Sequence, residues 1–236
     1  MKPIMFDPNC TACPRLADFL ADCRASRPDY YGRPVPPFGA AKPRLLIVGL
    51  APGYHGANRS GRPFTGDYAG VLLYQTLHAF GYASRPESTA ADDGLELIGC
   101  RITNAVKCVP PENKPTPDEI RRCNGYLKAE LEALPKGAAI LALGQIAHGA
   151  VLRALGLKLK DYPFGHAAVH QLPSPSGRGV GGEGKPRGEG KAEDAGTPLR
   201  LYDSYHCSRY NTQTRRLTPE MFQAVFAQIR KDREEA

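Results

Sequence analysis

The sequence contains no apolar run near the roughly 18 residues that a membrane-spanning helix requires. Its N-terminus, MKPIMFDPNCTACP, has no apolar core of the kind found in secretion signals. These two absences predict a cytoplasmic protein with no role at a membrane.

Two glycine-rich motifs of nucleotide-binding proteins are also missing, GxGxxG after the first strand and GxxxxGK[ST]. Their absence disfavours a nucleotide-binding redox protein. There are seven cysteines, and an odd number without a secretion signal argues against a disulfide framework. Metal binding or buried thiols explain these cysteines better.

The chain has 236 residues, of which 42% are hydrophobic, so a single domain (1–236) with a real core is expected. It carries 31 basic and 24 acidic residues, a net charge of +7, which permits an anionic partner but does not establish one. Prolines in an N-terminal arm, 1–43, favour an extended path over the domain. Residues 173–198 are rich in glycine, proline and charge, which predicts a disordered, passive insertion.

Strand and helix patterns alternate along the rest of the chain. Strands are expected at 45–49, 98–106, 138–143, 166–172 and 201–206. Helices are expected at 68–80, 116–134, 145–155 and 218–230. This order predicts an α/β fold with a mostly parallel sheet and helices on both faces.

One stretch combines a buried strand with a polar loop: residues 45–67, LLIVGLAPGYHGANRSGRPFTGD. The strand breaks sharply after Gly49, and the loop carries an imidazole, an amide, guanidinium groups, a carboxylate and one phenylalanine. Open α/β sheets bind ligands where a strand ends and its loop turns toward a helix. We therefore interpret this loop as the floor of an active site.

Four cysteines have spacings compatible with a metal site. Cys10 and Cys13 form a CxxC pair, Cys108 follows the second strand, and Cys123 lies on the next helix. Four thiolates can bind zinc or an iron–sulfur cluster. There is no second CxxC, which makes a zinc ribbon less favourable. Spacing alone leaves open whether Cys108 and Cys123 are ligands or only buried thiols.

Four motifs outside 173–198 resemble those of the iron–sulfur-containing, thermophilic-type uracil-DNA glycosylases, most of all the branch usually called family 5. They are GLAPG at 49–53, GRPFTGD at 61–67, ITNAVKC at 102–108, and HCS at 206–208 followed by Asn211 and RLT at 216–218.

The resemblance implies a three-layer αβα sandwich around a central, mostly parallel four-stranded sheet. It implies a [4Fe–4S] cluster on Cys10, Cys13, Cys108 and Cys123. It also implies a monofunctional DNA glycosylase, monomeric and nucleoid-associated. Such an enzyme removes uracil, and other deaminated bases such as hypoxanthine, to start base excision repair.

The residue types suit that chemistry, because a base in a duplex must be flipped into a pocket before it is excised. Phe64 can stack on the base, although a phenylalanine is more often a core residue. Asn104 offers a donor and an acceptor in one amide, although it could merely cap a turn. His206 can donate a hydrogen bond to the leaving base, a contribution of about 3–4 kcal/mol.

A carboxylate must also position water against the sugar, and Asp67 is the candidate. Its alternative role is to cap the helix that follows. Ala51 stands where related families have a polar catalytic residue. With Gly49, Pro52 and Gly53 it would form only a backbone wall of the pocket.

The loop after His206 is expected to meet DNA. Ser208 and Asn211 could bond phosphates, and Arg209 or Tyr210 could fill the gap left by the flipped base. Two departures from the family, Cys207 in place of proline and Arg215 in place of glycine, affect the geometry of this loop.

Lys107, near the third motif, is interpreted as a phosphate-binding or structural residue and not as a lyase nucleophile. The alternative to a glycosylase is a non-catalytic iron–sulfur DNA-binding module. Such a module would keep the charge and the cysteines but would not need an ordered Asp67 or His206.

Overall fold

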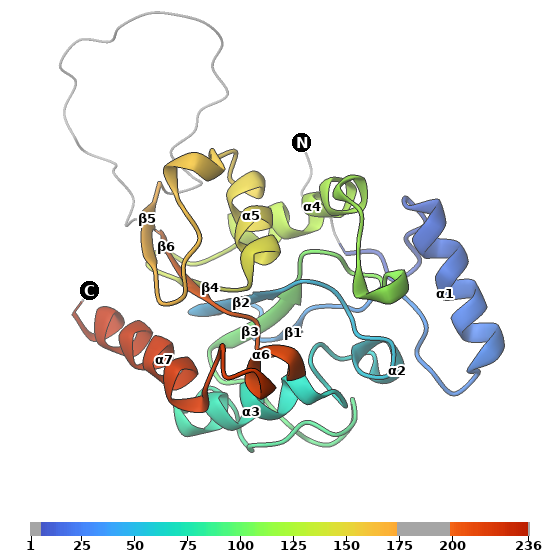
Figure 1. The fold of residues 1–236 in the computed structure, drawn as a ribbon, viewed down its shortest axis with the longest axis horizontal. Helices are drawn as coiled ribbons and strands as arrows, with labels where there is room; N and C mark the ends of the chain where they lie inside the picture. The colour runs from blue at the N-terminus through green and yellow to red at the C-terminus, as the bar shows by residue number, and fades with distance from the viewer. Residues whose placement is uncertain (1–5, 174–198, 236) are drawn as a thin grey trace, which may run out of the picture.

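A computed structural model of the protein describes residues 6–173 and 199–235 (Figure 1). The insertion expected at 173–198 lies outside these residues, apart from Pro173. The elements in chain order are α1 (Pro14–Ser26), β1 (Phe38–Gly39), β2 (Leu45–Gly49), α2 (Ala57–Ser60), α3 (Tyr68–Ala79), β3 (Cys100–Asn104), η1 (Pro111–Asn113), α4 (Pro117–Glu132), β4 (Ala139–Leu143), α5 (Gln145–Ala154), η2 (Leu159–Asp161), β5 (Val169–Leu172), β6 (Leu199–Ser204), α6 (Arg209–Gln213) and α7 (Pro219–Glu234).

The described strands form one sheet in the order β1-β3-β2-β4-β6-β5. The four inner strands run parallel, as expected. The count of four strands that the resemblance implied is too low, because β1 and β5 add antiparallel edges and make the sheet six-stranded. The sequence pattern predicts a strand at 166–172, where β5 lies, but none at β1. β1 is only two residues long, so it has no alternating pattern that the sequence could reveal.

Helices cover both faces of the sheet, which confirms the three-layer arrangement (Figure 1). One core cluster joins α1, α4 and α5 to one face, and the other joins α3 and α7 to the opposite face. All five residues of β2 are buried, because successive side chains point into opposite clusters and neither face meets water. No helix among the described residues has the length and apolar character to cross a bilayer.

The N-terminal arm is partly helical and is fixed to the domain. Leu16 and Leu20 of α1 are buried in the first core cluster. The guanidinium of Arg15 donates from Nε and Nη2 to both carboxylate oxygens of Glu119 on α4, each at 2.8 Å. Glu119 also completes the capping box with Thr116 at the start of α4, which confirms the predicted helix start.

Candidate active site at the carboxyl ends of the strands

The polar loop and the strand ends meet above Gly49. Gly49 ends β2 and pairs in register with Asn104, which ends β3. A β-carbon at Gly49 would lie 2.4 Å from Oδ1 of Asn104 and 2.7 Å from Cζ of Phe64. Glycine is therefore needed at this position to admit both side chains.

Phe64 faces the candidate catalytic histidine. Its ring stacks on the imidazole of His206, with centroids 5.8 Å apart and planes inclined by 28°. Phe64 is 6% exposed and also belongs to the core cluster of α3 and α7, so it packs as a core residue, and its stacking on a base stays a prediction. Its φ of 55° is unusual for a residue with a side chain and is maintained by its surroundings.

The amide of Asn104 carries an acceptor that the protein does not use. Asn104 is 4% exposed, and none of the described residues donates a hydrogen bond to its Oδ1. A buried acceptor without a partner costs about 1–3 kcal/mol, so its presence at a strand end indicates a site for a donor from a ligand.

His206 follows β6 and is half-buried. Burial lowers the pKa of its imidazole to about 4, so the ring is neutral at pH 7. A neutral imidazole keeps one N–H for donation. The carbonyl of His206 accepts a hydrogen bond from Nδ2 of Asn211 at 2.8 Å, which fixes the backbone that carries the ring.

Asp67 is indeed the N-cap of α3, and only one of its oxygens serves that role. Oδ1 accepts a hydrogen bond from the backbone N–H of Gly70 at 2.9 Å. Oδ2 faces the loop, because a β-carbon at Gly56 would lie 2.5 Å from it and one at Gly53 would lie 3.4 Å from it. Burial raises the pKa of Asp67, although hydrogen bonds from the backbone of Gly70 and Ala69 oppose the rise.

The break after β2 is fastened to the neighbouring strand end. The N–H of Ala105 donates to the carbonyl of Gly49, and the N–H of Val106 donates to the carbonyl of Leu50, both at 2.9 Å. Ala51 packs against the first core cluster, and Pro52 is buried. Residues 49–53 therefore form a rigid backbone segment with no titratable side chain.

The four cysteines converge on one cavity. Cys10, Cys13, Cys108 and Cys123 line a space of about 140 Å³. Burial and the neighbouring thiols raise the pKa of Cys108 to about 12, and the N–H of Lys107 donates to Sγ of Cys123 at 3.3 Å. Four thiols around one cavity are a donor set that a metal ion or an iron–sulfur cluster can use.

The loop after His206 separates into internal and exposed residues. Ser208 caps α6 by accepting from the N–H of Asn211 at 3.4 Å, so the side chains of both residues build the loop. Arg209 lies over the ring of Tyr68 at 5.1 Å, and Tyr210 is 70% exposed. Arg209 and Tyr210 are the exposed residues of the four, and contact with DNA stays a prediction for all four.

The two departures from the family pattern have clear structural settings. Cys207 is fully buried in the core cluster of α3 and α7, an apolar environment that would also suit the ring of a proline. Arg215 has a φ of 55°, a left-handed conformation that glycine adopts without strain. The family's usual glycine at this position is thereby explained.

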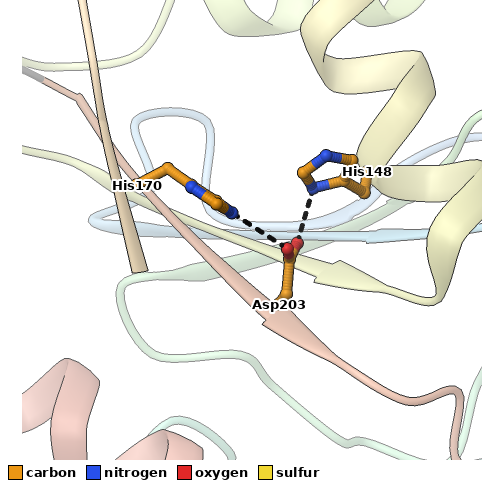
Figure 2. Close-up of side chains that lie close together, drawn as sticks. All are labelled: His148, His170 and Asp203. Carbon is orange, nitrogen blue, oxygen red and sulfur yellow. Dashed lines mark hydrogen bonds and ion pairs between the residues drawn. The ribbon is translucent and has the colours of Figure 1, made fainter. Parts of the chain in front are cut away.

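Several buried residues have partners that the sequence did not reveal. The Arg62 guanidinium and the Asp93 carboxylate form a buried ion pair, 2.7 Å apart, that joins the polar loop to residues 83–98. Lys107 is structural, because its ammonium is buried 2.7 Å from Glu130. A further group unites His148, His170 and Asp203 (Figure 2). Partners this far apart in sequence leave no local pattern.

A family model, that of the Uracil DNA glycosylase superfamily, matches residues 36–230. The chain belongs to this superfamily. Relatives named type-5 uracil-DNA glycosylase match nearly the full length of this chain. The protein of Thermus thermophilus is 44% identical over 94% of this chain and 93% of its own length. That of Mycobacterium leprae is 42% identical over 94% of this chain and 90% of its own.

A different class within the superfamily matches less of the chain. The type-4 uracil-DNA glycosylase of Archaeoglobus fulgidus is 38% identical over 48% of this chain and 49% of its own length. The full-length matches therefore place the chain with the type-5 branch, in agreement with its motifs.

Proposed function

We propose that the protein is a monofunctional uracil-DNA glycosylase that flips uracil out of DNA, hydrolyses its N-glycosidic bond and so initiates base excision repair. The observation that carries the proposal is the unpaired, buried Oδ1 of Asn104, next to Phe64 at the carboxyl ends of the strands. The names of the type-5 relatives support the same activity.

Asn104 would recognise the edge of the base. Uracil presents an N–H at N3 and a carbonyl oxygen at C4, so one amide can accept from the first and donate to the second. Cytosine has no hydrogen at N3 and would leave Oδ1 without a donor. The cost of that unpaired acceptor is the basis of discrimination. Phe64 offers the face on which the flipped base stacks.

His206 and Asp67 would act on the bond that breaks. Negative charge develops on the leaving base, and the neutral imidazole of His206 can donate its N–H to a base oxygen. The sugar develops positive charge at C1′. The free Oδ2 of Asp67 can hold a water molecule against that carbon while Oδ1 keeps its place at the helix start. Asp67 would then both cap α3 and position the water, two roles that the sequence analysis treated as alternatives.

We propose that Cys10, Cys13, Cys108 and Cys123, which line one cavity of about 140 Å³, would hold a [4Fe–4S] cluster. When bound, it supplies a covalent tie between the N-terminal arm, the end of β3 and α4. Its role would be structural, because it would reinforce the link between the N-terminal arm and α4 that the Arg15–Glu119 pair also makes. Brown colour and broad visible absorption of anaerobically purified protein test it.

We further propose that the protein is a monomer that acts on nucleoid DNA in the cytoplasm. Hypoxanthine is the second base we expect it to excise, because it also presents an N–H beside a carbonyl. Asn104 can bond that edge as it bonds uracil.

A gel assay with labelled oligonucleotides tests the activity. Cluster-loaded protein should convert a uracil-containing strand to an abasic product and leave the thymine control intact. Asp67→Asn should slow the reaction strongly, whereas Asp92→Asn, at an exposed carboxylate, should not. Intact uracil-containing DNA after prolonged incubation, together with equal binding of both strands, would instead indicate a non-catalytic DNA-binding module.

A further inference from the structure

Asp203 on β6 is fully buried between two histidines, His148 on α5 and His170 on β5 (Figure 2). Its Oδ1 lies 2.8 Å from Nδ1 of His148, and its Oδ2 lies 3.2 Å from Nε2 of His170. The other nitrogen of His148, Nε2, lies 2.9 Å from the carbonyl oxygen of Tyr162. Every contact of the His148 nitrogens is therefore with an oxygen that accepts.

These contacts determine the number of protons. A carbonyl oxygen can only accept, so Nε2 of His148 carries a hydrogen. An ionised carboxylate can only accept, so a second proton lies between Nδ1 and Oδ1. The imidazole holds it, because an imidazole is more basic than a carboxylate, with ordinary pKa values of about 6.5 and 3.9. The bond from His170 further stabilises the carboxylate.

The surroundings of His148 agree with a charged ring. Burial alone would lower its pKa, but the hydrogen bond and the charge of Asp203 outweigh burial and raise it. Besides Asp203 and His170, the ring faces the Tyr162 carbonyl and, edge to face, the ring of Phe164 at 5.6 Å. α4 packs on the same helix, where the neutral amide of Asn124 donates to the Ala150 carbonyl at 2.9 Å.

A metal ion is the competing interpretation of the three side chains, since their ligand atoms lie within 4.8 Å of one another. Two ligands of a tetrahedral zinc lie roughly 3.3 Å apart, from bonds of about 2.0–2.1 Å. The 2.8 Å separation of Nδ1 and Oδ1 is shorter than that and is typical of a charged hydrogen bond. A proton fills this space better than a metal ion.

The pair connects to the candidate site through the backbone. The N–H of Asp203 donates to the carbonyl of Ala168 at 3.0 Å, and the N–H of Ala167 donates to the carbonyl of Asp203 at 2.9 Å. In the same segment, the His166 ring stacks on Tyr205 at 5.0 Å, and its Nδ1 accepts from the Tyr205 N–H at 3.3 Å. Tyr205 directly precedes His206.

We propose that His148 is a buried imidazolium, paired with Asp203, and that it is a positioning residue for His206. The pair holds β6 and residues 162–168 together, so that the backbone leading from β6 to His206 keeps one conformation and the His206 ring one position. This inference rests on the proposed role of His206 in base release, but its charge state and its effect on the His206 ring are properties of the protein alone.

Nitrogen NMR of histidine-labelled holoprotein tests the charge directly. Both ring nitrogens of His148, assigned by their loss in His148→Gln, should carry protons at pH 7.5. His148→Gln and Asp203→Asn should also shift the ring signals of His206. His78→Gln, the same change at an exposed position, should not. A singly protonated His148, an unmoved His206 spectrum, or displacement of the proton by one equivalent of Zn²⁺ would each overturn the proposal.

Kinetics supply the functional half of the test. Single-turnover uracil release should fall about tenfold in His148→Gln and in Asp203→Asn, because misplaced catalytic groups lose rate steeply, while the Kd for DNA changes less than about twofold. The double variant should be no slower than the slower single variant, since both changes break one pair. Additive rate losses in the double variant, or unchanged rates in the single variants, would contradict the proposal. Wild-type protein that released no uracil would refute the proposed function, and the NMR result would still decide this inference.

Discussion

Gly49 and Asn104 are partners on adjacent parallel strands, and Oδ1 of Asn104 occupies space that a β-carbon at position 49 would need. Gly49→Ala should therefore displace the amide and the nearby Phe64 ring. We expect uracil release to fall at least about tenfold and the free energy of unfolding to fall by about 1–3 kcal/mol. Single-turnover assays and urea unfolding measure the two effects. Gly165→Ala, where the nearest side chain is 3.7 Å away, is the control and should behave as wild type.

Asn104→Leu should separate function from stability. It replaces an unpaired buried acceptor by an apolar side chain of similar volume, so the melting temperature should stay unchanged or rise. Uracil release should fall about a hundredfold or more, because the base loses its partner. A variant that loses activity only in proportion to a lower melting temperature would show that Asn104 is a structural residue.

The pH dependence of uracil release should report two groups. The pKa of Asp67 is raised by burial, so its carboxylate form is lost at a higher pH than in an exposed aspartate as the pH falls. The pKa of His206 is lowered to about 4, so its neutral form persists well below pH 7. The rate should rise with pH across the acidic range, where Asp67 and His206 both lose a proton, and then stay level past pH 7. Asp67→Asn should remove the part of the rise that Asp67 sets, and an unchanged profile in that variant would assign the whole rise to another group.

Arg215→Gly should stabilise the protein. A residue with a side chain costs roughly 1–2 kcal/mol in the left-handed conformation that Arg215 adopts, and glycine removes this cost. Part of the gain is lost because glycine gives the unfolded chain more conformational entropy. We expect the free energy of unfolding to rise by up to about 1 kcal/mol in denaturant titrations. Gln213→Gly, within α6, should lower it instead, and equal losses from both variants would refute the explanation.

The sequence predicted the parallel strands and long helices because their signals are local: a buried run such as LLIVG, or a threonine cap followed by proline and two acids. It also predicted Asn104 and His206 as parts of one base pocket, through the resemblance of their motifs to a known family. It could not reveal the buried pairs Arg62–Asp93 and His148–Asp203, which only the tertiary fold brings together. Nor could it show that the two oxygens of Asp67 face different neighbours.

The pairing of β5 with β6 shows where the chain can be shortened or extended by engineering. Leu172 and Leu199 are opposite each other in the antiparallel register, so the ends of the segment between them lie side by side at the sheet edge. A two-residue Asn-Gly turn can span such a pair. The same position therefore offers a place to shorten the gene product, or to insert a fluorescent or affinity module, without moving the strand ends that carry Asn104 and His206.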